Sequence, residues 1–339
     1  MPTIDIGKEK WNQAVEVAPD FWVVATHHHP GGSKYNPEIN NRCLVFRLKD
    51  AAAGGTPVLL VANATDEVAL PEVRRIEKET GAPIRYVVAV GAGHSLRLAA
   101  WHDALPAARV LVGPARIPRI AAGRKLASSP RFTIFDGSAP LPMFRGQLEA
   151  VNFDGIGGFK EAVTPLEGGK DSPLGFFKVM LTNMPPRDPH DELWLYHVAS
   201  RTIIGGENLG WNLSTTELAK MGFMLRMMMK SEQVYVMTGP RPVLDKGRVK
   251  ANWERVLAWP AENILSYHDT IGTGQIGGGQ AALRAAVEKA KSNYRIRPSD
   301  SNGGIAAVGS LWLSIQLAYS LRITSVGSNA LTTKANVTS

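Results

Sequence analysis

The sequence predicts a mixed α/β protein in which two β-sheets pack together and helices cover their outer faces. Short apolar runs of strand length, such as 57–63 and 87–90, stand on either side of a helix-spaced segment at 67–80. The runs are continuously apolar, as expected where both faces of a sheet are covered. A second strand-rich half begins near residue 192 and closes on helices. This order indicates two packed sheets with helices outside.

The first half is expected to begin with strands at 21–25, 41–48 and 57–63. A helix at 67–80 follows, because its apolar residues have helical spacing and Gly81 and Pro83 end it. A short helix at 98–101 then separates two buried strands, which are expected at 87–90 and 108–114. Residues 130–175 are rich in Gly and Pro and predict only short strand-like pieces, such as 131–135.

The second half is expected to open with strands at 192–197 and 202–208. Ser214 and Glu217 have the spacing of a capping box, which predicts a helix running to about residue 230. The last expected elements are a helix at 249–259, a strand at 263–268 and a helix at 280–292.

Composition limits the classes of partner and compartment. The net charge of +8 comes from scattered basic residues, without a basic and aromatic stripe, so we expect no nucleic-acid partner. The single cysteine, Cys43, excludes an internal disulfide and a cysteine-rich metal site. The N-terminus lacks an apolar signal region, which favours a cytoplasmic location. Residues 304–321 are uncharged, but Gln316 and three serines favour a buried or interface helix over a membrane span.

The stretch from Ile84 to His94 carries the most specific resemblance, with a β-branched strand, a glycine turn and a following helix that contains Trp101. It resembles the metallo-β-lactamase fold at the point where that fold places His-x-His-x-Asp-His. The four ligand slots hold other residues here, so the motif is degenerate. In the ungapped alignment these slots are Gly91, Gly93, Ser95 and Leu96.

Further features resemble a divergent branch of that superfamily: an opening Trp hairpin, an Arg-led strand at 41–44, and Trp101 after His94. The resemblance covers about residues 21–273. It implies a four-layer αβ/βα sandwich at 21–275, preceded by an N-terminal extension at 1–20. A helical C-terminal cover with a polar tail is expected at 276–339.

The resemblance also implies a metal site beyond the lost motif. His190 precedes a strand, Glu207 follows one where the family has a bridging Asp, and His268 falls at a family histidine slot. With His94 they form a candidate ligand set for zinc, iron or manganese. Asp269 is then a candidate base or a partner of His268. Each histidine alone also fits a structural role at a sheet edge.

The implied function is hydrolysis of an ester, ether or amide bond by a metal-activated water. A buried core or interface helix is the default explanation for the methionines and aromatics around 211–229, and the alternative is a pocket for a small apolar or aromatic substrate. The alternative is a non-catalytic or partner-dependent subunit with a decayed metal site. His27 to His29 fit a loop at the pocket mouth better than a metal site. Apolar stretches at 221–229 and 304–321 predict a homo-oligomer, or a hetero-oligomer with a paralogous subunit.

Overall fold

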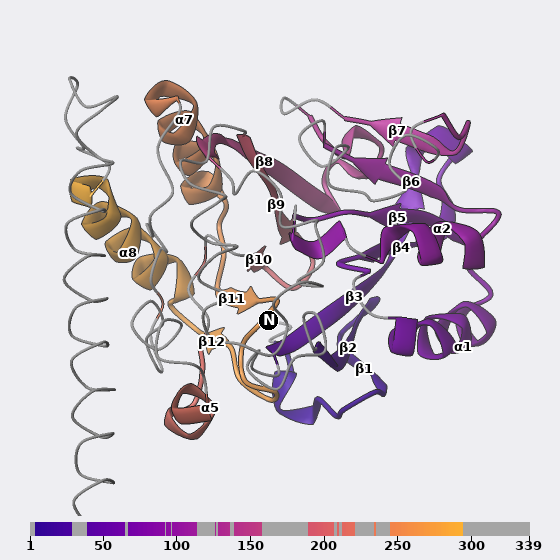
Figure 1. Ribbon diagram of the computed structural model, residues 1–339, viewed down its shortest axis with the longest axis horizontal. Coiled ribbons are helices and arrows are strands. Elements are labelled where there is room, and N and C mark those ends of the chain that lie inside the picture. The colour runs from indigo at the N-terminus through magenta and orange to yellow at the C-terminus, as the bar shows by residue number, and fades with distance from the viewer. Residues whose placement is uncertain are drawn as a thin grey trace, which may run out of the picture. The chain divides into compact units, whose positions relative to one another are not determined.

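The computed structural model contains two β-sheets with helices on both outer faces (Figure 1), and its described side chains form three apolar cores. Residues 1–294 form one unit and residues 295–339 a second. All residues described below belong to the first unit. The structure describes residues 4–28, 39–64, 67–91, 93–95, 97–113, 126, 128–135, 139–157, 189–206, 209, 212–220, 234 and 245–293.

The first sheet has seven strands in the order of the sequence. The pairs β1–β2, β2–β3 and β3–β4 are antiparallel, whereas β4–β5, β5–β6 and β6–β7 are parallel. The strands are β1 (Ala14–Ala18), β2 (Phe21–His28), β3 (Ile39–Asp50), β4 (Thr56–Ala62), β5 (Ile84–Val88), β6 (Arg109–Val112) and β7 (Phe132–Ile134).

The second sheet has five strands in the order β12-β11-β10-β9-β8. Only β10 and β11 run parallel, and the other neighbours are antiparallel. The strands are β8 (Leu148–Gly157), β9 (Pro189–His197), β10 (Thr202–Gly205), β11 (Asn263–Ser266) and β12 (Gln275–Ile276).

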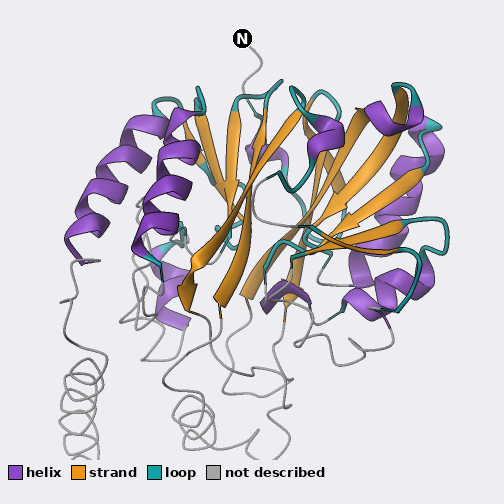
Figure 2. Cartoon of the chain, turned by 90° about the horizontal axis from the view of Figure 1, so that it is seen from above, coloured by secondary structure: helices purple, strands orange, loops and turns teal. Residues whose placement is uncertain are grey.

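Helices form the two outer layers, and the view in Figure 2 shows them on either side of the strands. The α-helices are α1 (Leu70–Thr80), α2 (Leu98–Ala104), α5 (Thr215–Lys220), α7 (Lys246–Ala258) and α8 (Gly279–Asn293). Short 3-10 turns are η1 (Ile6–Lys8), η3 (Ala51–Ala53), η4 (Glu67–Ala69), η5 (Gly93–Ser95) and η7 (Pro142–Phe144).

The three cores follow from the period-two alternation of side chains along each strand. In β4, Leu60 and Ala62 face the core between the sheets, whereas Leu59 and Val61 face α1 and α2. In β9 the residue Trp194 faces a third core, which the side chains of α7 and α8 complete. The layers are therefore helix, sheet, sheet and helix, which confirms the predicted αβ/βα sandwich.

The two sheets meet at one edge. Gly91, just past β5, forms an antiparallel bridge with Glu192 of β9, and Leu193 donates its main-chain N–H to Val90 at 2.6 Å. In the first sheet β4 runs parallel to β5, and in the second β10 runs parallel to β11, so the carboxyl ends of each pair lie side by side. Chain segments that leave such strand ends are the usual location of binding sites in α/β proteins.

Most of the expected elements are confirmed within the described residues, including the capping box. Ser214 N lies 3.3 Å from Glu217 Oε2, and Glu217 N donates to Ser214 Oγ at 3.2 Å. Three strands were not predicted from sequence: β1, the ten-residue β8 and the two-residue β12. The proposed domain boundaries at 20/21 and 275/276 stay predictions.

Several sequence-based predictions lie outside the described residues. These are the methionine-rich stretch at 221–229, the uncharged segment at 304–321 and residues 29–38, which include His29. The expectation that His27 and His28 lie in a loop is wrong, because both belong to β2, where they pair with β3. In the part of the chain that the structure describes, every helix is too short or too polar to span a membrane.

Candidate functional site

Two histidines that are 174 residues apart in the sequence meet where the two sheets join. His94 lies in η5, just after β5, and His268 lies in the loop after β11. Their Nε2 atoms are 3.1 Å apart and the ring centroids 4.8 Å apart. Both side chains are buried, with 5% and 6% exposed. The pair is the most distinctive chemical feature of this edge.

The tautomer of His94 is determined by Asn63 at the end of β4. Asn63 Nδ2 donates to the main-chain carbonyl of Arg42 at 2.8 Å, so the orientation of the amide is defined. The opposite atom, Oδ1, therefore faces His94 Nδ1 at 2.6 Å. Because this oxygen only accepts, Nδ1 of His94 carries the proton. Asn63 itself is fully buried and has a left-handed backbone, with φ at 59°.

The tautomer of His268 is determined in the same way from the start of β3. Its Nδ1 lies 2.7 Å from the main-chain oxygen of Asn40. A carbonyl oxygen accepts and never donates, so Nδ1 of His268 carries the proton. In neutral histidines Nε2 is then the basic nitrogen of both rings.

Two basic nitrogens 3.1 Å apart repel each other through their lone pairs unless a cation lies between them. One solution is a single shared proton, which makes one ring an imidazolium. The other is a metal ion that both nitrogens ligate. A metal-binding histidine usually donates its other ring N–H to a carbonyl or carboxylate oxygen, and both rings donate Nδ1–H to such an oxygen here.

A buried ion-pair network centred on Arg42 contacts the loop that carries His268. Its guanidinium forms a two-bond pair with Glu9, at 2.6 Å and 2.8 Å, and its Nη1 lies 3.2 Å from Asp269 Oδ2. Burial alone would lower the pKa of Arg42, but Glu9 and Asp269 together raise it above its usual value. The positive charge of Arg42 is therefore permanent.

The carboxylate of Asp269 faces this network. It accepts main-chain hydrogen bonds from Ser266 at 2.8 Å and Asn212 at 2.7 Å. Burial raises the pKa of Asp269 to about 6, against the lowering effect of Arg42 and of the two N–H donors. Asp269 is thus a buried carboxylate that titrates close to neutral pH.

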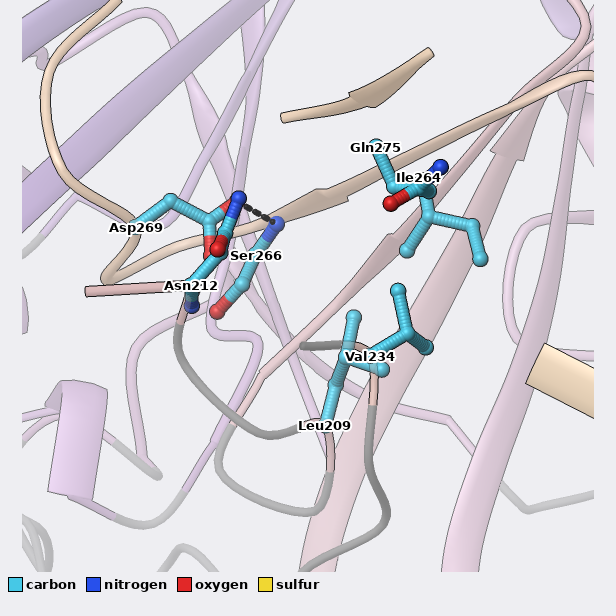
Figure 3. A pocket seen from close by; sticks show the side chains of 7 residues that line it. All are labelled: Leu209, Asn212, Val234, Ile264, Ser266, Asp269 and Gln275. Atoms are coloured by element: carbon cyan, nitrogen blue, oxygen red, sulfur yellow. Dashed lines mark hydrogen bonds between the residues drawn. The ribbon is translucent and has the colours of Figure 1, made fainter. Parts of the chain in front are cut away.

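A small cavity lies beside Asp269, and Figure 3 shows the side chains that line it. Asn212, Ser266 and Asp269 form a polar end, and Leu209, Val234 and Ile264 form an apolar one, with Gln275 beside them. The space holds about one water molecule. This cavity does not by itself accommodate a substrate.

The structure brings together two of the four predicted metal ligands, His94 and His268. The backbone of His190 belongs to β9, but its side chain and the whole of Glu207 lie outside the described residues. Their part in the site stays a prediction. Within the described ranges, no group of three or more His, Cys, Asp or Glu side chains is arranged to hold a metal ion. The two imidazoles fit zinc in donor type, and further ligands would have to come from elsewhere.

Two local features shape the turn that carries His94. Ser95 donates its hydroxyl to the Gly91 carbonyl at 2.9 Å. A Cβ on Gly91 would lie 3.2 Å from the His94 ring, so the small residue there leaves room for that ring. Gly91 and Ser95 thus fix the conformation of this turn.

Sequence reasoning missed Glu9, Asn63 and Asn40 as site residues. Glu9 lies before the first expected strand, and nothing in its local sequence indicates a buried partner 33 positions away. For Asn63 a signal existed, because an asparagine at the end of an apolar strand is typical of a left-handed residue.

No protein-family model and no curated protein sequence matches the chain. Solved structures are similar in fold. One is a metallo-β-lactamase from Pontibacter korlensis, at 10% identity and a TM-score of 0.46, covering 81% of this chain and 97% of the other. Another is the FIM-1 metallo-β-lactamase from Pseudomonas aeruginosa in its mono-zinc form, at 14% identity and a TM-score of 0.45, covering 84% and 97%.

A third similar structure is a fragment of a putative diflavin flavoprotein from Nostoc sp. PCC 7120. It shares 12% identity at a TM-score of 0.46, and the match covers 83% of this chain and 95% of the fragment. Two of the three are metallo-β-lactamases by name. At these identities the likeness concerns the fold, and function has to be argued from the site itself.

Proposed function

We propose that the protein is a metal-dependent hydrolase whose metal centre includes His94 and His268. One observation carries the proposal: both rings are held with Nδ1 protonated, so their basic Nε2 atoms converge at 3.1 Å. Two nitrogen ligands at about 2.0–2.1 Å from a tetrahedral zinc ion are about 3.3 Å apart, close to this separation. We infer that His190 and Glu207 complete the ligand set.

The residues divide the work as follows. His94 and His268 would hold the ion through Nε2, while Asn63 and the Asn40 carbonyl keep the rings oriented. When bound, the ion would supply a water of lowered pKa for attack on an ester, ether or amide bond. Asp269 supports the site through the loop that carries His268, because its carboxylate binds that loop at Ser266 N.

The substrate we propose is small and apolar or aromatic, from the methionine-rich stretch at 221–229. We also propose a cytoplasmic oligomer that does not bind nucleic acid. The scattered basic residues and the uncharged segment at 304–321 support these expectations.

A second candidate is a non-catalytic or partner-dependent subunit. The observation that favours it is the loss of all four first-motif ligands, whose slots hold Gly91, Gly93, Ser95 and Leu96. In that case the histidine pair shares a proton and has a structural role.

Metal loading followed by hydrolysis assays separates the two candidates. The full chain is stripped with chelator, reloaded with zinc, iron or manganese, and assayed on nitrophenyl esters with small acyl groups. We expect about one tightly bound ion per chain and hydrolysis, both lost in His268→Gln. The matched control is His102→Gln, because His102 is a similarly buried histidine that contacts Ser129 and Arg131 instead. A protein that retains no metal and is inactive alone would support the second candidate.

A further inference from the structure

We propose that Arg42 and Glu9 are positioning residues that hold the loop from Ser266 to Thr273, and thereby place His268 against His94. What the histidine pair does rests on the proposed function, but the placement itself rests only on geometry. The two residues come from distant parts of the chain: Arg42 from β3, and Glu9 from the segment after η1.

Within the described residues, the hydrogen bonds of the Arg42 guanidinium go to Glu9 or to this loop. Nη1 donates to the carbonyl of Ser266 at 2.7 Å and faces Asp269 Oδ2. Nη2 donates to the carbonyls of Thr270 at 3.1 Å and Thr273 at 2.9 Å. The bonds therefore reach the loop on both sides of His268. A planar group with five donors can make such a set, whereas a lysine cannot.

Glu9 orients the guanidinium and also binds the loop directly. Its two oxygens accept from Arg42 Nε and Nη2, and Oε2 accepts the main-chain N–H of Gly272 at 2.7 Å. Its segment is anchored, because Ile4 and Ile6 are buried in the core between the sheets. The N-terminal segment is thus a structural part of the histidine site.

The start of β3 contacts His268 through its backbone as well. The N–H of Arg42 donates to the carbonyl of Tyr267 at 3.0 Å, and the carbonyl of Asn40 accepts from His268 Nδ1 at 2.7 Å. Asn40 and Arg42 are two residues apart in β3, so one strand supplies both the acceptor for the ring and the clamp for its loop.

A buried ion pair of this kind contributes little net stability, because desolvation of the charges offsets their attraction. Its bonds instead specify one conformation of the loop. His94 is held separately, by the Asn63 side chain. Loss of the clamp should therefore release His268 and leave His94 in place, which distinguishes positioning from general stabilisation.

The test uses the full chain labelled with ¹⁵N-histidine, and follows the ring Nδ1–H signals by NMR. The variants are Arg42→Lys and Glu9→Gln, and Arg47→Lys is the control. Arg47 lies on the same strand but makes a half-exposed pair with Asp20. Signals are assigned with His94→Gln and His268→Gln.

In the wild type and the control we expect two slowly exchanging Nδ1–H signals. In both clamp variants the His268 signal should exchange at least tenfold faster, while the His94 signal is unchanged. Where Arg42→Lys does not fold, Glu9→Gln decides alone. Retention of both signals would overturn the proposal, and so would the joint loss of both signals with the fold in Glu9→Gln. A selective loss in a protein that binds no metal would support the clamp and refute only the proposed function.

Discussion

Replacing Asn63 tests how much the histidine site depends on a single buried amide. Asn63→Gly keeps the left-handed backbone but deletes the side-chain bonds to His94, Asn41 and Arg42. Each lost bond is worth about 1 kcal/mol, and a buried partner left unsatisfied costs about 1–3 kcal/mol. Since the partners are buried, we expect a loss of about 3–5 kcal/mol in the free energy of unfolding.

Asn63→Ala adds a backbone cost to the same deletion. A residue with a Cβ pays about 1–2 kcal/mol in the left-handed region, where φ at position 63 is 59°. The alanine variant should therefore be less stable than the glycine variant by about 1 kcal/mol.

Urea unfolding at pH 7 measures these differences through the midpoint at constant m-value. The control is Asn12→Gly, because Asn12 has a similar φ of 56° but an exposed side chain, and we expect little change there. A loss below about 1 kcal/mol for Asn63→Gly would refute the assigned bonds. Equal stability of the glycine and alanine variants would refute the backbone argument.

Two further predictions concern the fold away from this site. Burial lowers the pKa of His197 to about 4 from 6.5, so only the unfolded chain gains a proton between these values. The free energy of unfolding should then fall by about 3 kcal/mol as the pH drops from 6.5 to 4. Asp269, with its pKa raised to about 6, has the opposite effect on stability, so the contribution of His197 is isolated by comparing His197→Gln with wild type. If the free energy of unfolding of both proteins depends on pH in the same way, the prediction is wrong. In Gly155→Ala the new Cβ would lie 2.8 Å from the Asp245 carbonyl and from Val249, which should cost about 1–3 kcal/mol in thermal unfolding. Gly247→Ala, in the exposed first turn of α7, should be neutral or stabilising, and equal effects of the two changes would contradict the packing at Gly155.

Much of the fold was predictable because strong local patterns agree with the tertiary structure. The run at 57–63 became β4, which is buried on both faces, and the spacing at 67–80 became η4 and α1. The strand β8 was not predictable, because Asn152, Asp154 and Gly155 interrupt its apolar pattern. Its register shifts between Phe153 and Ile156, and its inner face packs on residues far away in sequence.

The site was predictable only in part, for a physical reason. His94 and His268 each follow a strand, so the position of a histidine just after an apolar run predicts them as site residues. Their neighbours act through bonds that span most of the chain: Arg42 reaches Ser266 across 224 residues, and Glu9 reaches Gly272 across 263. No local periodicity encodes such contacts. The Arg-led strand carries a family resemblance, but only the structure shows which residues the Arg42 side chain binds.

Cobalt(II) titration of the apo-protein tests the central claim most directly, because cobalt takes the place of zinc and its visible absorption reports the ligands. With the full chain we expect an absorption change that saturates near one equivalent. The affinity for cobalt should fall at least tenfold in His94→Gln and in His268→Gln, and should be unchanged in His102→Gln. Absence of any absorption change, or a change that both site variants leave intact, would show that the histidine pair is not a metal centre.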